Sequence, residues 1–223
     1  MLIKKIVNFS MDQNIYVVYD EKSKEGIIID PGASPERVIA CVDEFGVDVK
    51  AIVLTHGHAD HIGAVPALKA KYNVPVVCHE CEQDVLEDAT INLSTMFYGP
   101  MEFSADILLK DGEIFKFGDI EMKCLHTPGH TAGGACYYIE KEKIVFSGDT
   151  LFYGSIGRTD FPNSGRKIKE HRCGCGYPMS ENFAKLIDSI RTKLITLPDD
   201  TVVLSGHGQE TNIFKERNYN PFL

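Results

Sequence analysis

The segment Thr55-His56-Gly57-His58-Ala59-Asp60-His61 carries four potential metal ligands within six positions. It follows Val49–Leu54, an apolar run with the composition of a buried strand. Imidazole and carboxylate groups suit zinc, iron or manganese, and a turn can aim alternate residues at one or two ions. The spacing differs from the helical His-Glu-x-x-His motif. We therefore expect a metal site at the end of this strand.

Three further turns share this design, because each follows an apolar run and presents one potential ligand beside glycine. They are Gly129-His130, Gly148-Asp149 and Gly206-His207. Taken singly, such a histidine is more often a surface or core residue, and such an aspartate is more often a turn former or helix cap. Loops from several strands can, however, converge at one edge of an open sheet. The sequence therefore predicts one site built from seven ligand positions.

Short runs rich in valine and isoleucine alternate with segments of helical spacing, which indicates a mixed α/β fold. A helix is expected after Ser34 as its N-cap, with Pro35 at its first position and Gly46 at its end. Asp111-Gly112 is typical of a hairpin turn. Since no linker or repeat is evident, we expect one domain over 1–223 with an insertion loop at 162–179. Strands are expected at Ile15–Tyr19, Gly26–Ile29, Val49–Leu54, Val74–Cys78, Ile120–Leu125, Ala135–Ile139, Lys143–Phe146 and Thr201–Leu204, and further helices at His61–Tyr72, His79–Asp88 and Ser180–Leu194.

The net charge of -9 disfavours nucleic acid and anionic membranes as partners, because both carry negative fields. No apolar run approaches the roughly 18 residues that a membrane span needs, and no secretion signal is evident. An odd number of cysteines, seven, without such a signal is typical of reduced thiols. These observations predict a cytoplasmic protein and leave its oligomeric state open.

The order of the seven residues resembles the metallo-β-lactamase fold superfamily, whose pattern is His-x-His-x-Asp-His followed by His, Asp and His. The closer similarity is to the short, single-domain glyoxalase II-like hydrolases. It is carried by 127–131, 147–152, 154–160, 197–201 and the terminal Asn-Pro-Phe-Leu at 220–223. The resemblance implies a four-layer αββα sandwich of two mixed β-sheets flanked by helices, with two divalent ions at one edge.

The resemblance also implies roles for the seven residues. Zinc is the first expectation for the two ions, with iron or manganese as alternatives. Two cations lower the pKa of a shared water and polarise a carbonyl, and Asp60 and Asp149 would be the catalytic carboxylates. By position, one ion would bind His56, His58 and His130, the other would bind Asp60, His61 and His207, and Asp149 would bridge them.

A thioester is the first substrate class to consider, because a thiolate leaves without the proton that an amide nitrogen needs. Glyoxalase II-like relatives act on acylated glutathione, so we expect a hydroxyacylglutathione hydrolase-like thioesterase with a small-molecule substrate. Full-length relatives bind glutathione partly through a C-terminal helical region, whereas this chain ends at 223, shortly after His207. The basic residues Arg166, Lys167 and Arg172 could receive glutathione carboxylates instead, although a solvated loop is the plainer interpretation. Tyr153 and Arg158 are candidates to line the pocket.

Several alternatives stay open. Persulfide dioxygenases share the fold, and His56, His130 and Asp149 could form their two-histidine, one-carboxylate site for a single iron. β-Lactamase activity is disfavoured by the aspartate at the bridging position and by the absence of a secretion signal. An RNA nuclease is disfavoured by the acidic balance, and a noncatalytic binding module by the retention of all seven ligand positions. Cys173 and Cys175, with one nearby histidine, are too few ligands for a closed zinc site.

Overall fold

Strand β2, Gln13–Tyr19, is buried along its whole length. Its side chains alternate between the two faces of the sheet, as the period of two in a strand requires. Val17 and Tyr19 belong to one hydrophobic cluster and Tyr16 and Val18 to another. A sheet that is apolar on both faces must be covered on both sides, which explains the layered architecture.

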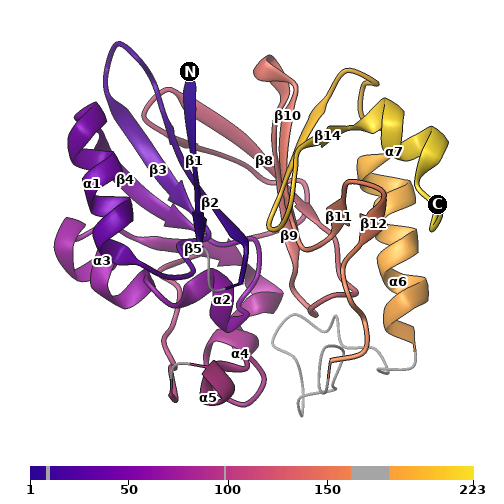
Figure 1. Ribbon diagram of the computed structural model, residues 1–223, viewed down its shortest axis with the longest axis horizontal. Helices are drawn as coiled ribbons and strands as arrows, with labels where there is room; N and C mark the ends of the chain where they lie inside the picture. Colours follow the sequence, from indigo (N-terminus) through magenta and orange to yellow (C-terminus); the bar gives the residue numbers. More distant parts are fainter. Residues whose placement is uncertain (9–10, 98, 162–180) are drawn as a thin grey trace.

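The structure is a computed structural model that describes residues 1–8, 11–97, 99–161 and 181–223. Two six-stranded sheets pack face to face, and helices cover both outer faces (Figure 1). Each sheet contains antiparallel and parallel pairs, so the predicted αββα sandwich of two mixed sheets is confirmed. The first sheet has the order β1-β2-β3-β4-β5-β6, with β1 at Leu2–Asn8, β3 at Glu25–Ile29, β4 at Asp48–Val53, β5 at Val76–His79 and β6 at Ile107–Leu109.

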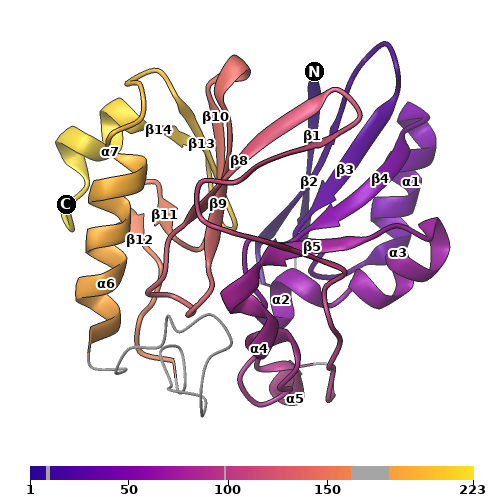
Figure 2. The ribbon, with the colours of Figure 1, turned by 180° about the vertical axis from the view of Figure 1, so that it is seen from behind.

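The second sheet lies opposite the first and has the order β14-β13-β10-β9-β8-β7 (Figure 2). Side chains from both sheets form the central hydrophobic layer, in which Phe146 of the second sheet meets Tyr16 of the first at a ring-centroid distance of 5.3 Å. Its strands are β7 at Ile114–Phe117, β8 at Ile120–His126, β9 at Ala135–Ile139, β10 at Ile144–Gly148, β13 at Val202–Ser205 and β14 at Thr211–Asn212, and a separate hairpin joins β11 at Leu151–Phe152 to β12 at Ser155–Ile156.

Helices on the first sheet bury Val42 and Leu68 against it, and helices on the second bury Leu186 and Ile213. Within the described residues, no helix has the length and apolar character needed to cross a membrane. The helices are α1 at Pro35–Phe45, α2 at Ala59–Ile62, α3 at Val65–Tyr72, α4 at Gln83–Leu86, α5 at Ser94–Phe97, α6 at Asn182–Ser189 and α7 at Ile213–Tyr219, with 3-10 turns at Glu80–Glu82 and Glu140–Glu142 and a π turn at Ile190–Leu194.

The structure corrects several predicted helices and turns. The helix expected over His61–Tyr72 is two helices, because Pro66 lies in the first turn of α3, where its missing N–H costs nothing. The one expected over His79–Asp88 is a 3-10 turn followed by the short α4. Ser34 precedes α1, but its side chain makes no capping hydrogen bond. The turn at Asp111-Gly112 joins strands of different sheets, so it does not close a hairpin.

The cysteines are not all reduced. Cys41, Cys78, Cys124 and Cys136 are free thiols. Cys81 is disulfide-bonded, so the expectation of reduced thiols is wrong for this residue. The cytoplasmic location inferred from reduced thiols stays a prediction.

Hydrogen bonds join the two sheets where their strands end. The Tyr137 hydroxyl donates to the carbonyl of Leu54 at 2.8 Å, immediately before the first ligand segment. The Tyr16 hydroxyl donates to the carbonyl of Ser205 at 2.7 Å, immediately before the last one. The Ala135 N–H donates to the carbonyl of Thr55 at 2.9 Å. The ligand loops of both sheets are therefore fixed to each other at one edge of the sandwich.

Replacing Phe146 with alanine tests the central layer. Phe146 is 1% exposed, so we expect Phe146→Ala to lower the free energy of unfolding by about 3–5 kcal/mol through lost burial and a residual cavity. Phe183 is 52% exposed, and Phe183→Ala should change it by less than about 1 kcal/mol. Urea denaturation followed by circular dichroism measures both. Equal losses would contradict the assignment of Phe146 to the core.

Candidate metal centre

The loop after β4 is held in place by Asp30, a buried residue immediately after β3. One Asp30 carboxylate oxygen accepts the Thr55 N–H at 2.7 Å, and the other accepts the Thr55 hydroxyl at 2.5 Å. The second oxygen also lies 3.0 Å from Nδ1 of His61. This carboxylate fixes the start of the loop and orients the His61 ring, which leaves Nε2 of His61 facing the site.

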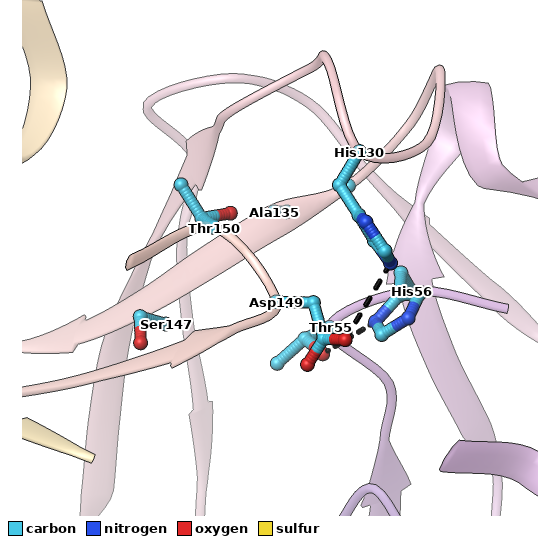
Figure 3. Close-up of a pocket in the computed structure, with 8 residues that line it drawn as sticks. Thr55, His56, His130, Ala135, Ser147, Asp149 and Thr150 are labelled. Atoms are coloured by element: carbon cyan, nitrogen blue, oxygen red, sulfur yellow. Dashed lines mark hydrogen bonds and ion pairs between the residues drawn. The ribbon is translucent and has the colours of Figure 1, made fainter. Parts of the chain in front are cut away.

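His56, His58 and His130 form a first cluster, whose ligand atoms lie within 4.8 Å of one another. His58 Nδ1 is 2.9 Å from His130 Nε2. The His56 ring centroid is 4.8 Å from that of each of the other two. Figure 3 shows His130 and His56 approaching Asp149 from separate loops. The three imidazoles therefore converge on one small volume.

Asp60, His61 and His207 form a second cluster of the same compactness. His207 Nε2 lies 3.2 Å from an Asp60 carboxylate oxygen and 3.4 Å from His61 Nε2. Asp60 and His61 belong to α2, which lies at the lower edge between the sheets in Figure 1. His207 comes from the loop after β13 of the opposite sheet. Each cluster thus combines ligands from both sheets.

Asp149 lies between the two clusters. Its Oδ1 is 3.3 Å from Nε2 of His61, and its Oδ2 is 3.6 Å from Nε2 of both His130 and His207. One carboxylate therefore reaches residues of both clusters. The structure brings together all seven residues singled out in the sequence.

Burial and charge set the protonation of the site. Burial lowers the pKa of His58 to about 3, and it also lowers the pKa values of His56 and His130. Neutral imidazoles keep the lone pair that a metal ion needs. Burial acts in the same sense on His61, but the carboxylates of Asp149, Asp60 and Asp30 outweigh it and raise the pKa of His61. The field around the second cluster therefore favours a cation.

The donors fit divalent metal ions. His56 Nε2 and Asp149 Oδ1 are buried and have no hydrogen-bond partner among the described residues. Leaving buried polar atoms unpaired costs free energy that coordination would recover. Asp30 forms another compact group with His56 and His61, but its oxygens already accept hydrogen bonds from Thr55 and His61. We therefore assign Asp30 to ligand orientation and the other seven residues to coordination.

Glycine beside the ligands permits this convergence. A Cβ atom on Gly206 would lie 2.4 Å from Asp149 Oδ1 and 2.6 Å from Cε1 of His61. A Cβ atom on Gly157 would lie 1.7 Å from the carbonyl oxygen of Asp149. Backbone and ligand can approach this closely only where no side chain intervenes.

A cavity of about 300 Å³ opens beside both clusters. Arg158 lines it, as predicted, and pairs with Asp160 at 2.9 Å. Phe152 lines it where Tyr153 was expected, because Tyr153 is 51% exposed and lies near Lys215. The other apolar lining side chains are Met11, Leu93, Phe97 and Phe161. The predictions for Arg166, Lys167, Arg172, Cys173 and Cys175 lie outside the described residues, as does the insertion at 162–179.

A separate cluster of His79, Cys81 and His126 does not extend this centre. The His79 and His126 rings stack in parallel at 3.9 Å. His126 Nε2 lies 3.0 Å from the carbonyl oxygen of Ala132. Because Cys81 is disulfide-bonded, it offers no thiolate. These side chains pack beside the metal centre as structural residues.

Two buried carboxylates beside the site, Asp30 and Glu82, are not among the residues predicted from the sequence. Glu82 accepts hydrogen bonds from Gly57 and Gly133, beside the ligand segments. Asp30 could have been found, because it follows an apolar strand and precedes Pro31-Gly32, in the same design as the ligand turns. Glu82 follows no such strand end, and nothing in the local pattern distinguishes it from its acidic neighbours.

Comparison with known proteins gives consistent matches. The family model described as the metallo-beta-lactamase superfamily matches residues 11–207. Hydroxyacylglutathione hydrolase GloC of Haemophilus influenzae is 35% identical over 100% of this chain and 98% of its own length. The solved structure of the BLEG-1 B3 metallo-beta-lactamase is 38% identical over 100% of this chain and 99% of that one, with a TM-score of 0.86. The structure of TTHA1623 in a di-iron-bound form is 31% identical over 99% and 100%, with a TM-score of 0.78.

Removing the Asp30 charge tests its role in orienting His61. We expect Asp30→Asn to weaken zinc binding about 10–100-fold, because carboxylates behind metal-binding histidines contribute on this scale. Asp48→Asn, which alters a surface ion pair with Lys50, should leave affinity unchanged. Competition with a chromophoric chelator measures both. An unaltered affinity in Asp30→Asn would contradict the role.

Proposed function

The chain belongs to the metallo-beta-lactamase superfamily, and from that premise we propose that it is a thioesterase working with two divalent metal ions. The observation that carries this proposal is the pair of ligand clusters with Asp149 between them. A binuclear metallo-hydrolase places its two ions side by side so that both act on one substrate. Asp149 reaches both clusters, as a bridging carboxylate must.

The residues divide into holders of ions and groups that handle protons. His56, His58 and His130 would hold one ion, and Asp60, His61 and His207 the other. When bound, such ions supply a water of lowered pKa and polarise the substrate carbonyl. Asp60 is 17% exposed at its side chain and lies beside His207, so its carboxylate can accept a proton at the cavity wall. Arg158 O accepts from His130 Nδ1 at 2.7 Å and fixes that ring.

The chemistry of the leaving group favours a thioester. A thiolate departs without protonation, whereas an amide nitrogen needs a general acid. Asp149 is held anionic, since its histidine neighbours lower its pKa against the opposing effect of burial. It is therefore a poor acid. This supports thioester hydrolysis over cleavage of a β-lactam amide, the substrate class indicated by the name of BLEG-1.

The cavity supports a substrate with an apolar part and an anionic part. Phe97, Phe152 and Phe161 provide apolar surface beside the ligand clusters. The Arg158 guanidinium lies over the Phe161 ring at 4.4 Å and is the cation among the described lining residues. We propose that Arg158 receives a carboxylate of a glutathione conjugate, a substrate class named by the relative GloC. The basic residues Arg166, Lys167 and Arg172 remain proposed contacts for the same group.

Metal analysis and a substrate panel test the proposal. Protein purified without added metal should contain about two zinc, iron or manganese ions per chain and should hydrolyse an acylglutathione faster than a lactone or a β-lactam. Asp149→Asn should lose one metal equivalent and lower kcat/KM about 100-fold or more, because electrostatic stabilisation of the transition state falls. Asp48→Asn is the matched surface control.

Two outcomes would contradict this function. One iron per chain with oxygen consumption on glutathione persulfide would establish the dioxygenase alternative, in which His56, His130 and Asp149 serve a single ion. Two ions with turnover of a β-lactam and none of thioesters would assign the amide chemistry instead.

A further inference from the structure

Glu82 is a carboxylate in the core that the proposed reaction does not use. It ends the 3-10 turn Glu80–Glu82 and is 0% exposed. Within the described part of the chain, no lysine or arginine pairs with it. An unpaired buried carboxylate is costly unless hydrogen bonds compensate.

Three donors from two separate loops satisfy Glu82. Its Oε1 accepts the Gly57 N–H at 2.6 Å. Its Oε2 accepts the Thr131 hydroxyl and the Gly133 N–H, both at 2.9 Å. Gly57 lies between His56 and His58, while Thr131 follows His130. One carboxylate therefore bridges the two loops that carry the first cluster.

The backbone is shaped to admit this bridge. A Cβ atom on Gly133 would lie 2.1 Å from the backbone nitrogen of Glu82, so only glycine permits the approach. A Cβ atom on Gly57 would lie 3.0 Å from side-chain atoms of Val85 and Leu86. The loops are thus packed directly against the turn and against α4.

Two buried carboxylates, Asp30 and Glu82, support the clusters in different ways. Asp30 lies behind His61 of the second cluster and contacts that ring directly. Glu82 contacts the backbone on either side of the first cluster and touches none of its imidazoles in the described hydrogen bonds. Both carboxylates hold the loop after β4, Asp30 through Thr55 and Glu82 through Gly57. In the described hydrogen bonds, Glu82 alone of the two also reaches the loop that carries His130.

We propose that Glu82 is a positioning residue that sets the distance between the loop of His56 and His58 and the loop of His130, and thereby controls the metal affinity of that cluster alone. This rests on the ligand assignment in the proposed function, but not on the substrate. Glutamine cannot replace Glu82, because all its partners donate. In either orientation the amide N–H₂ of glutamine would face a backbone N–H, from Gly57 or from Gly133.

Single-cluster backgrounds isolate the effect. His207→Ala leaves the first cluster intact, and His58→Ala leaves the second. In the His207→Ala background, Glu82→Gln should weaken zinc affinity about 10–100-fold, the range for residues that position ligands. In the His58→Ala background it should leave the affinity unchanged. Asp30→Asn, which removes the carboxylate behind His61, should weaken zinc affinity in the His58→Ala background. Zinc titration calorimetry of the apo proteins measures all four combinations.

Matched variants separate positioning from general damage to the fold. Glu80→Gln changes a neighbouring carboxylate in the same turn and should have no effect in either background. Thr131→Val removes one donor and should weaken zinc binding in the His207→Ala background by less than Glu82→Gln does. It serves as the test should Glu82→Gln fail to fold, as judged by thermal unfolding of the apo protein.

Equal losses in both backgrounds, or no loss in the His207→Ala background, would overturn the proposal. Thioester turnover is assayed separately on the wild-type protein. Absence of turnover together with the predicted zinc pattern would refute the proposed function and leave the role of Glu82 standing. Turnover without the predicted zinc pattern would support the proposed function and refute the role of Glu82.

Discussion

The metal centre depends on hydrogen bonds that join two sheets at the ends of their strands. Tyr137 and Tyr16 are inward-facing residues of opposite sheets, and each donates its hydroxyl to a carbonyl of the other sheet. The accepting carbonyls belong to Leu54 and Ser205, which immediately precede the first and last ligand loops. Packing of the central apolar layer brings the sheets together, and these bonds fix the alignment that the ligands need.

Buried carboxylates then organise the loops. Burial alone would leave Asp30 and Glu82 costly, and each is compensated by donors on loops that carry ligands. Burial raises the pKa of Glu82 to about 7, against the lowering effect of its three donors. Burial also disfavours the charged form of the histidines of the first cluster, so it lowers their pKa values and keeps them neutral. Burying these groups lowers the stability of the fold, and such a cost is common where groups serve a functional site.

Much of this arrangement could be predicted because residue types that bind metals stand directly after predicted strands in the sequence. His56, His130, Asp149 and His207 each lie in a turn after an apolar strand, and strand ends of a layered fold meet at an edge. Such local signals carry no information on the partner of a side chain. Glu82 therefore escaped detection, since its three donors lie 25 to 51 positions away.

Boundaries were harder to predict than the strands themselves. The edge strand β1, with its half-exposed pattern, offered no clear alternation. The helix predicted over His61–Tyr72 contains Pro66, which lies instead in the first turn of a second helix. Phe152 and Tyr153 are neighbours in the sequence. Phe152 ends the short strand β11 and lines the cavity, whereas Tyr153 follows the strand and does not. These outcomes depend on tertiary packing that a local pattern does not encode.

Residues from both sheets together form two adjacent candidate metal positions. An anomalous difference map from crystals of the zinc-loaded protein tests this arrangement. We expect two peaks with zinc–nitrogen distances of about 2.0–2.1 Å, one among His56, His58 and His130 and one beside His61 and His207. No peak at these positions, or zinc bound only between His79 and His126, would contradict it.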